Sequence, residues 1–246
     1  MTPLEKLDAT IASRFAELLS LPWAKGFLSS VASGDRRSYA VFLIQIFHYT
    51  SHTPRTQALV GSRPDNTDPH YQKYCFDHAL EETGHELMAL HDLRALGLEV
   101  EAKRLPRALP ATELLVAYLY HISQTGNPVQ RLGFTYWAER SYQFIADAVG
   151  TVRDGMQLQR ANMTFFYNHS AIDAKHADDV TAVLKRVCKT DEDWAAVARV
   201  TETTMRLTLQ MVEESYQEYA RLAIGAPSEY ELLNALITED RARVAA

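Results

Sequence analysis

The sequence predicts an all-α protein, a single-domain bundle of about seven helices. Apolar residues recur at helical spacing along almost the whole chain, and no segment shows the strict alternation that is typical of a strand. The few glycines and prolines fall between the periodic segments, where helix-breaking residues belong. Because no repeat of fixed length recurs, we expect a compact bundle over residues 1–246 rather than a repeat array.

Caps and helix breakers set the expected boundaries. The first helix should begin at Pro3 with Thr2 as its N-cap. Pro54 lies inside the third segment and should kink it or end its regular hydrogen bonding, whereas Gly97 should end the fourth and Thr112 should cap the fifth. Residues 61–69 are expected to form a loop. In chain order the expected helices cover approximately residues 3–18, 22–34 (a short piece), 36–60, 70–96, 112–121, 129–149, 157–188 and 191–224, with a short helix after 227.

Composition and charge exclude several classes of function. A net charge of −6 with no basic stripe on any helix argues against nucleic acid as a partner. The longest apolar stretches, 40–47 and 114–120, are too short to span a bilayer, and the N-terminus lacks the apolar segment of a secretory signal. We therefore expect a soluble, cytoplasmic protein that binds no membrane. Cys75 and Cys188 are expected to be free, partly buried thiols.

Two segments carry histidines and carboxylates at helical spacing. Glu82 and His85 lie three residues apart, so on a continuous helix both side chains leave the same face. Di-iron helix bundles use this Glu-x-x-His spacing to bind metal. His169, Asp173 and His176 follow at i, i+4 and i+7, which share one stripe of a helix with about 3.6 residues per turn. Polar side chains on a buried stripe must be paired or coordinated, so the pattern predicts a metal site.

A third candidate, Glu139, lies between these segments in a strongly apolar and aromatic stretch, LGFTYWAERSYQFI. A carboxylate there needs a cation. Arg140 is adjacent in sequence and points elsewhere on a helix, which leaves a metal or a partner from another helix. Three histidines and three carboxylates on three helices could then share two ions roughly 3.5–4 Å apart, with Glu139 as the bridge.

Other interpretations stay open. Each motif alone is typical of a solvated pair on a helix surface, and together they could form a satisfied polar network in the core. Glu81 could replace Glu82 as a ligand on spacing alone. We expect His78 to support a ligand or to be a satisfied core histidine rather than to bind metal, and Asp92 to hydrogen-bond a ligand.

The combination of Glu82-x-x-His85, a lone Glu139 and His169-x-x-x-Asp173-x-x-His176 resembles the haem-oxygenase-like di-iron oxidases and oxygenases. The resemblance extends over most of the chain, including the segments HYTSHTPR and LHDLRALG. It implies a seven-helix bundle that binds two non-haem iron ions through these six residues, the second ion weakly. It also implies an O2-activating oxidoreductase that oxidises a small organic molecule. The helix with His169, Asp173 and His176 is expected to be the more mobile one.

The resemblance leaves the substrate and the outcome open, since related enzymes act on amino acids, guanidines or fatty acids by N-oxygenation, C–C cleavage or oxidative decarboxylation. We expect a small amine or carboxylate metabolite such as an amino acid, in a biosynthetic pathway. Arg36, Arg37 and Arg55 could bind its acid group. The candidate substrate-binding residues are His48, Tyr49, His52 and Arg55.

Three alternatives compete with this interpretation. A fatty-acid oxidative decarboxylase of the same family could use Phe42, Leu43, Ile46 and Phe47 to line an acyl tunnel. A metal-independent enzyme like TenA or PqqC would share the fold but would not need the six ligands. A ferritin-like storage or binding protein usually shows two Glu-x-x-His motifs, and only one is present here. The sequence leaves a homodimer and an external electron donor open.

Overall fold

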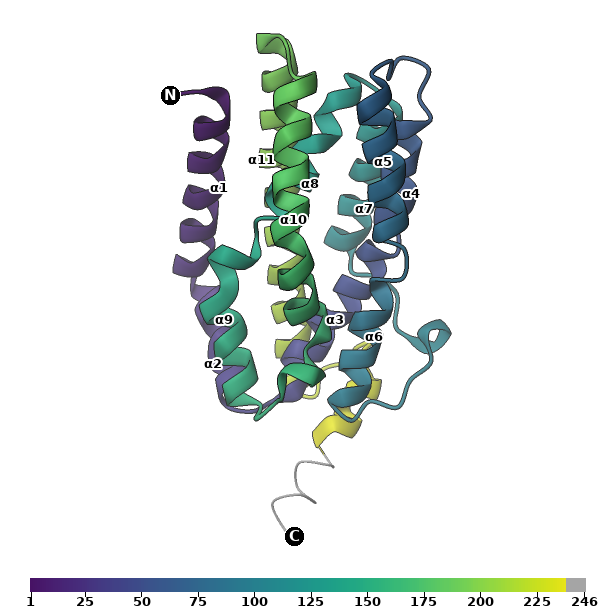
Figure 1. Ribbon diagram of the computed structural model, residues 1–246. Coiled ribbons are helices and arrows are strands. Elements are labelled where there is room, and N and C mark those ends of the chain that lie inside the picture. Colours follow the sequence, from purple (N-terminus) through teal and green to yellow (C-terminus); the bar gives the residue numbers. More distant parts are fainter. Residues whose placement is uncertain (238–246) are drawn as a thin grey trace.

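Helices joined by short turns make up the protein in the computed structural model, which describes residues 1–237 except for the side chains of residues 169–175 (Figure 1). Residues 1–237 contain eleven α-helices and no strand. The helices are α1 (Pro3–Ser20), α2 (Pro22–Ala32), α3 (Arg36–Thr50), α4 (Thr53–Gly61), α5 (Pro69–Glu81), α6 (Glu86–Ala95), α7 (Pro110–Gln124), α8 (Leu132–Ala138), α9 (Tyr142–Gly155), α10 (Thr164–Val187) and α11 (Asp191–Ala223). Short 3-10 turns cover Ala102–Arg104, Pro128–Arg131 (η2), Arg160–Asn162 and Glu231–Asn234.

The all-α prediction is confirmed, but about seven helices was too low a number because three expected helices are each divided by a turn. The chain turns before Pro54, which has no backbone N–H to continue α3 and instead lies in the first turn of α4. Gly84 divides α5 from α6 with a φ of +95°, a conformation that glycine adopts without steric cost. The third turn, at 139–141, has neither residue and closes through a hydrogen bond from the Ser141 N–H to the Ala138 carbonyl.

The caps show how well local signals define helix ends. Thr2 caps α1 and forms a reciprocal capping box with Glu5, as its position before Pro3 predicts. Thr112 was wrong as a cap, because α7 begins two residues earlier at Pro110. Its hydroxyl instead donates to the Gln45 side-chain oxygen at 2.9 Å, which joins α7 to α3.

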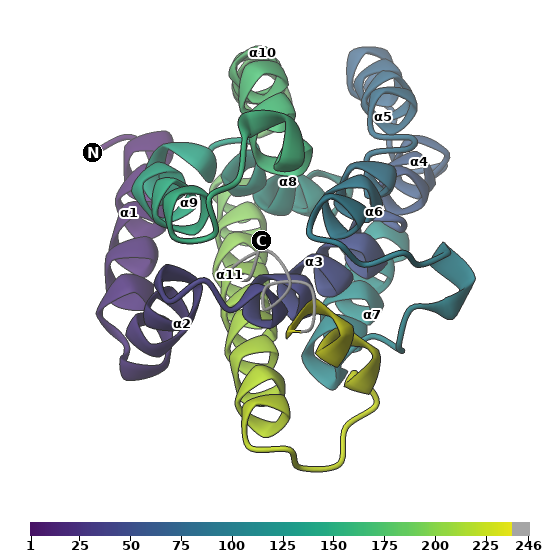
Figure 2. The ribbon, with the colours of Figure 1, turned by 90° about the horizontal axis from the view of Figure 1, so that it is seen from below.

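The longest helix, α11, forms the centre of the bundle. Its 33 residues span about 50 Å, and it packs against α1, α2, α3, α7 and α8. Viewed from below, α11 and α3 lie in the middle, with α1, α2 and α9 on one side and α4 to α7 on the other (Figure 2). Both cysteines are buried and free. Within residues 1–237, no helix combines the length and apolarity needed to cross a bilayer.

Close backbone contact fixes α8 against α11. The Thr201 hydroxyl of α11 donates to the Gly133 carbonyl of α8 at 2.8 Å. A side chain at Gly133 would meet the backbone of Val197 and Thr201, so only glycine allows this approach. Because Glu139 follows α8 directly, this contact also sets the position of that carboxylate.

Replacing Gly133 by alanine should force α8 away from α11, because the added methyl group would overlap the carbonyl oxygen of Val197. We expect Gly133→Ala to lower the free energy of unfolding by about 1–3 kcal/mol, as overpacking does in other cores. Gly150→Ala is the matched control, since no atom lies within 4 Å of a Cβ built there and alanine favours the interior of α9. Urea unfolding measures both effects. Equal stability of the two variants would contradict the packing described.

Candidate metal centre

Four buried side chains from three parts of the chain converge inside the bundle. His78 lies on α5, Glu82 at the end of α5, Glu139 at the end of α8 and His176 on α10. One nitrogen or oxygen atom of each lies within 4.8 Å of the others. Their burial ranges from 2% exposed for His176 to 10% for the Glu139 side chain, so water does not satisfy these groups.

Glu139 is the centre of this four-residue cluster. One of its carboxylate oxygens lies 3.0 Å from His78 Nε2 and the other lies 3.3 Å from His176 Nδ1. Burial alone would raise the pKa of Glu139, but the close contacts with His176 and His78 lower it to about 2. The contact with the Glu139 carboxylate raises the pKa of His176 to about 9. We expected a cation beside Glu139, and the imidazoles of His78 and His176 lie there.

The donor set fits a first-row transition metal such as iron. Carboxylates and imidazoles are the ligands that non-haem iron prefers, and the cluster offers two of each. His78 Nδ1 is buried without a hydrogen-bond partner. Buried polar atoms of this kind are rare unless an ion or a water satisfies them. We expected His78 to support a ligand, and it lies inside the cluster itself. The expected helix over residues 70–96 does not continue past Glu82, because α5 ends there.

His85 reaches the cluster through Glu82. The two residues belong to the turn between α5 and α6 rather than to one helix face, and His85 Nδ1 lies 3.2 Å from a Glu82 carboxylate oxygen. Burial opposes the charge on Glu82, but the hydrogen bond with His85 outweighs it and lowers the pKa of Glu82. The same bond raises the pKa of His85 against the effect of burial. Glu82 and His85 are thus in contact, but they meet within a turn and not along one face of a helix.

The α10 motif is described only in part. His176 is buried in the cluster, and its Nε2 lies 3.1 Å from a carboxylate oxygen of Glu81. Glu81, the alternative to Glu82, is thus beside the cluster, with its side chain 43% exposed. His169 and Asp173 lie outside the described residues.

Asp92 fixes the start of α10. Its fully buried carboxylate accepts hydrogen bonds from the Thr164 N–H at 2.7 Å, the Thr164 hydroxyl at 2.8 Å and the Phe165 N–H at 3.0 Å. A carboxylate at a helix N-terminus is favoured by the exposed N–H groups and the helix dipole. We expected Asp92 to hydrogen-bond a ligand directly, and its oxygens instead hold the helix that carries His176.

The candidate substrate-binding residues occupy different places. His48 Nε2 lies 2.8 Å from the Pro106 carbonyl oxygen, and His52 Nδ1 lies 3.0 Å from the Tyr120 hydroxyl, so both imidazoles join α3 and its C-terminal turn to neighbouring segments. Arg55 is exposed on α4. Only Tyr49 lines a cavity beside the cluster.

The other two candidate acid-binding arginines are structural. Arg36 donates to the Leu96 carbonyl at 2.9 Å. Arg37 pairs with Asp35 at 2.7 Å and donates to the Asn234 side-chain oxygen at 3.1 Å. Both are buried, and both bind chain groups at the end of α3 away from the cluster. Neither Arg36 nor Arg37 lines the pocket beside the cluster, so the structure gives no support to an acid-binding role for these two residues.

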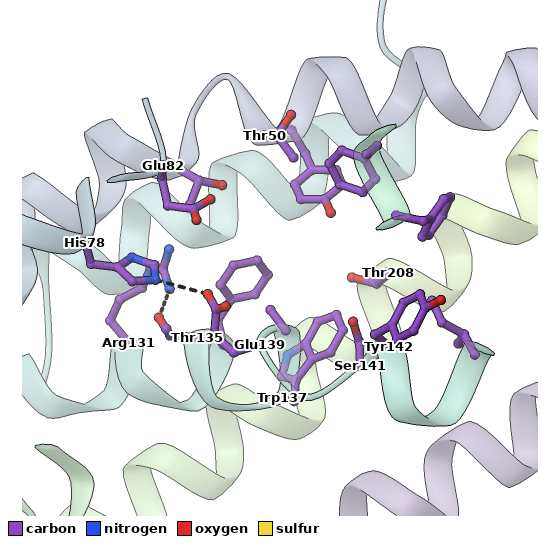
Figure 3. A pocket seen from close by; sticks show the side chains of 17 residues that line it. Thr50, His78, Glu82, Arg131, Thr135, Trp137, Glu139, Ser141, Tyr142 and Thr208 are labelled. Atoms are coloured by element: carbon purple, nitrogen blue, oxygen red, sulfur yellow. Dashed lines mark hydrogen bonds and ion pairs between the residues drawn. The ribbon is translucent and has the colours of Figure 1, made fainter. Parts of the chain in front are cut away.

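Two neighbouring pockets lie beside the cluster, and we call them the polar chamber and the apolar chamber. The polar chamber, of about 100 Å³, is lined by His78, Glu82 and Glu139 and also by Arg131, which the sequence did not single out (Figure 3). These charged residues gather at one end in Figure 3, and Ser141, Tyr142 and Thr208 lie at the other. Seven residues line both chambers and so stand between them: Tyr49, Trp137, Ser141, Ile145, Phe165, Phe166 and Thr208.

The apolar chamber is the larger one, at about 190 Å³. Side chains of α1, α2, α3, α9 and α11 enclose it, and nearly all are aliphatic or aromatic. Phe42 and Ile46, two of the four residues proposed for an acyl tunnel, belong to its lining. An apolar cavity of this kind binds an apolar ligand group rather than a charged one.

Comparison with known proteins identifies the family of this chain. Residues 40–210 match the model of the family described as iron-containing redox enzymes, and the chain belongs to this family. No curated protein matches the sequence. A domain of unknown function from Shewanella denitrificans OS217, with a haem oxygenase-like fold, is 40% identical, with a TM-score of 0.84 over 91% of this chain and 96% of that one. The expected relationship to haem-oxygenase-like iron enzymes is thus confirmed.

Two more distant structures share the fold alone. A TenA homologue from Pyrococcus furiosus is 13% identical, with a TM-score of 0.66 over 87% of this chain and all of that one. A TenA homologue from P. horikoshii OT3 is 12% identical, with a TM-score of 0.64 over 88% of this chain and 99% of that one.

The Glu139–His176 pair should make the stability of the metal-free protein depend on pH. Because folding raises the pKa of His176 from 6.5 to about 9, the stabilisation is complete below pH 6.5 and is lost as the pH rises through 9. Melting temperatures are measured with chelator at pH 7 and 9.5. Between these pH values we expect the melting temperature of the wild type to fall by roughly 5 °C more than that of Glu139→Gln. Parallel pH profiles for the two proteins would count against the ion pair.

Proposed function

We propose that this protein is a non-haem iron oxidase that binds two iron ions and uses O2. The observation that carries the proposal is the buried convergence of two imidazoles and two carboxylates beside a cavity, in a chain of the iron-containing redox enzyme family. Glu82, Glu139 and His176 would hold the metal, together with His85 and with His169 and Asp173. His78 is a further candidate because it lies inside the cluster.

Bound Fe(II) would supply the electrons that reduce O2. The chain would contribute three things. Glu139 would help to hold the metal, since each of its two oxygens is free of the other's partner: one contacts His78 and the other His176. Trp137 and Phe165 line the cavity and keep bulk water from the reacting groups. Asp92 holds the start of α10 and so helps to hold the ligand stripe in register with α5 and α8.

For the substrate, we propose a carboxylic acid with an aliphatic chain, oxidised with loss of its carboxyl group. The apolar chamber favours this fatty-acid alternative over an amino acid, since burying an ammonium group among aliphatic side chains would be strongly unfavourable. Both chambers are lined by Trp137 and Thr208, so the two pockets are neighbours. A chain could therefore lie in the apolar chamber while the acid group reaches the metal centre.

Metal binding tests the centre. We expect wild-type protein, loaded anaerobically with Fe(II) and desalted, to retain iron and to melt at a higher temperature than the chelated protein. Glu139→Ala and His176→Ala should retain at least about tenfold less iron. His70→Ala removes an exposed histidine and should bind like the wild type. Iron content by mass spectrometry gives the result, and retention of iron by Glu139→Ala would overturn the assignment.

Substrate-triggered O2 consumption tests the activity. We expect fatty acids to accelerate O2 uptake by the Fe(II)-loaded protein and 1-¹³C-labelled acids to release ¹³CO2, because the apolar chamber accepts the chain. Amino acids should leave the rate unchanged. Turnover that persists with chelator present would instead indicate a metal-independent enzyme, and acceleration by amino acids alone would reject the aliphatic substrate.

A further inference from the structure

Arg131 is a buried cation that no carboxylate neutralises. It ends η2 and directs its side chain into the core, where the residue is 1% exposed. Its guanidinium donates to the hydroxyls of Thr135 at 2.9 Å and Thr56 at 3.4 Å and lies 4.6 Å from the centre of the Phe134 ring. Its Nε has no hydrogen-bond partner. Within the described part of the chain, no carboxylate lies within ion-pair distance of this guanidinium.

Such an arrangement is unusual because a buried charge costs several kcal/mol unless it is paired and fully hydrogen-bonded. Two hydroxyls and one aromatic face stabilise the guanidinium only in part. Burial lowers its pKa to about 10, so it remains charged at neutral pH. A group that stays charged and incompletely bonded in a core is typical of a site that awaits an anion.

The position of Arg131 identifies where such an anion would lie. Arg131 lines the polar chamber together with His78, Glu82 and Glu139, and Figure 3 shows it beside His78 and Thr135. The nearby glutamates already contact histidines and would be neutralised by bound metal. The positive charge of Arg131 would then remain for a ligand at the metal end of the cavity.

We propose that Arg131 binds the acid group of the substrate. The planar guanidinium presents paired N–H donors that match a carboxylate, which a lysine or a hydroxyl cannot reproduce. The rest of the substrate would extend past Trp137 and Thr208, whose hydroxyl has no hydrogen-bond partner, into the apolar chamber. This assignment rests on the proposed function and specifies its ligand as a carboxylate with an apolar tail.

Binding of matched probes tests the assignment without turnover. Octanoate and octan-1-ol share one tail and differ in charge, and Zn(II)-loaded protein binds them without redox chemistry. We expect calorimetric titration to show that the wild type prefers octanoate. Arg131→Met should weaken octanoate on the order of tenfold or more while leaving octanol unchanged. Arg131→Lys should recover part of the loss, and Arg199→Met, which removes an exposed arginine of α11, should match the wild type.

A second variant keeps the test decisive if Arg131→Met does not fold. Thr135→Val removes the hydroxyl that accepts from Arg131 Nη1 and should weaken octanoate a few fold without affecting octanol. If Arg131→Met folds and still prefers octanoate as the wild type does, the role of Arg131 is overturned and the proposed function is not. If only Thr135→Val folds, the same result with that variant has the same meaning. Failure of the wild type to bind either probe overturns the proposed aliphatic substrate and this assignment together.

Discussion

The burial of one carboxylate organises the interior of this protein. Glu139 is almost completely removed from water, and its two oxygens are satisfied by histidines from α5 and α10. Removing a carboxylate from water costs several kcal/mol, so these contacts must form together with the fold. They join segments 61 and 37 residues away along the chain, so one carboxylate links α5, α8 and α10. The geometry of the cluster thus depends on this buried carboxylate.

Several residues of the site lie in turns at helix ends. Glu82 and His85 flank Gly84, and Glu139 begins the turn after α8. At a helix end a side chain can be aimed by the turn rather than by the 3.6-residue period of the helix. The carboxylates of Glu82 and Glu139 therefore approach one another from helix ends, while apolar packing elsewhere sets the axes of the helices. His176, in contrast, extends from the middle of α10.

Local signals predicted the helices well and the site less completely. Thr2 with Pro3 defined the start of α1. Glu82 and His176 were singled out by their helical spacing to other candidate ligands, and Glu139 because it stood in an apolar and aromatic stretch. The turn at 139–141 could not be predicted, since no glycine or proline marks it. The contact of His78 with Glu139 could not be predicted because its partner is 61 residues away, and Arg131 was missed because long cations in apolar stretches often extend to solvent.

Different helices form the two ends of the cavity region, and only one end is anchored by the contact between α8 and α11. The backbone contact at Gly133 ties the carboxylate end to the longest helix, whereas α1, α2 and α9 enclose much of the apolar end. Substitutions on these outer helices can enlarge, shorten or reshape the apolar chamber while the cluster at the other end stays in place. Under the proposed function, a scaffold divided in this way would let natural variation change the accepted substrate length without altering the residues that hold the metal.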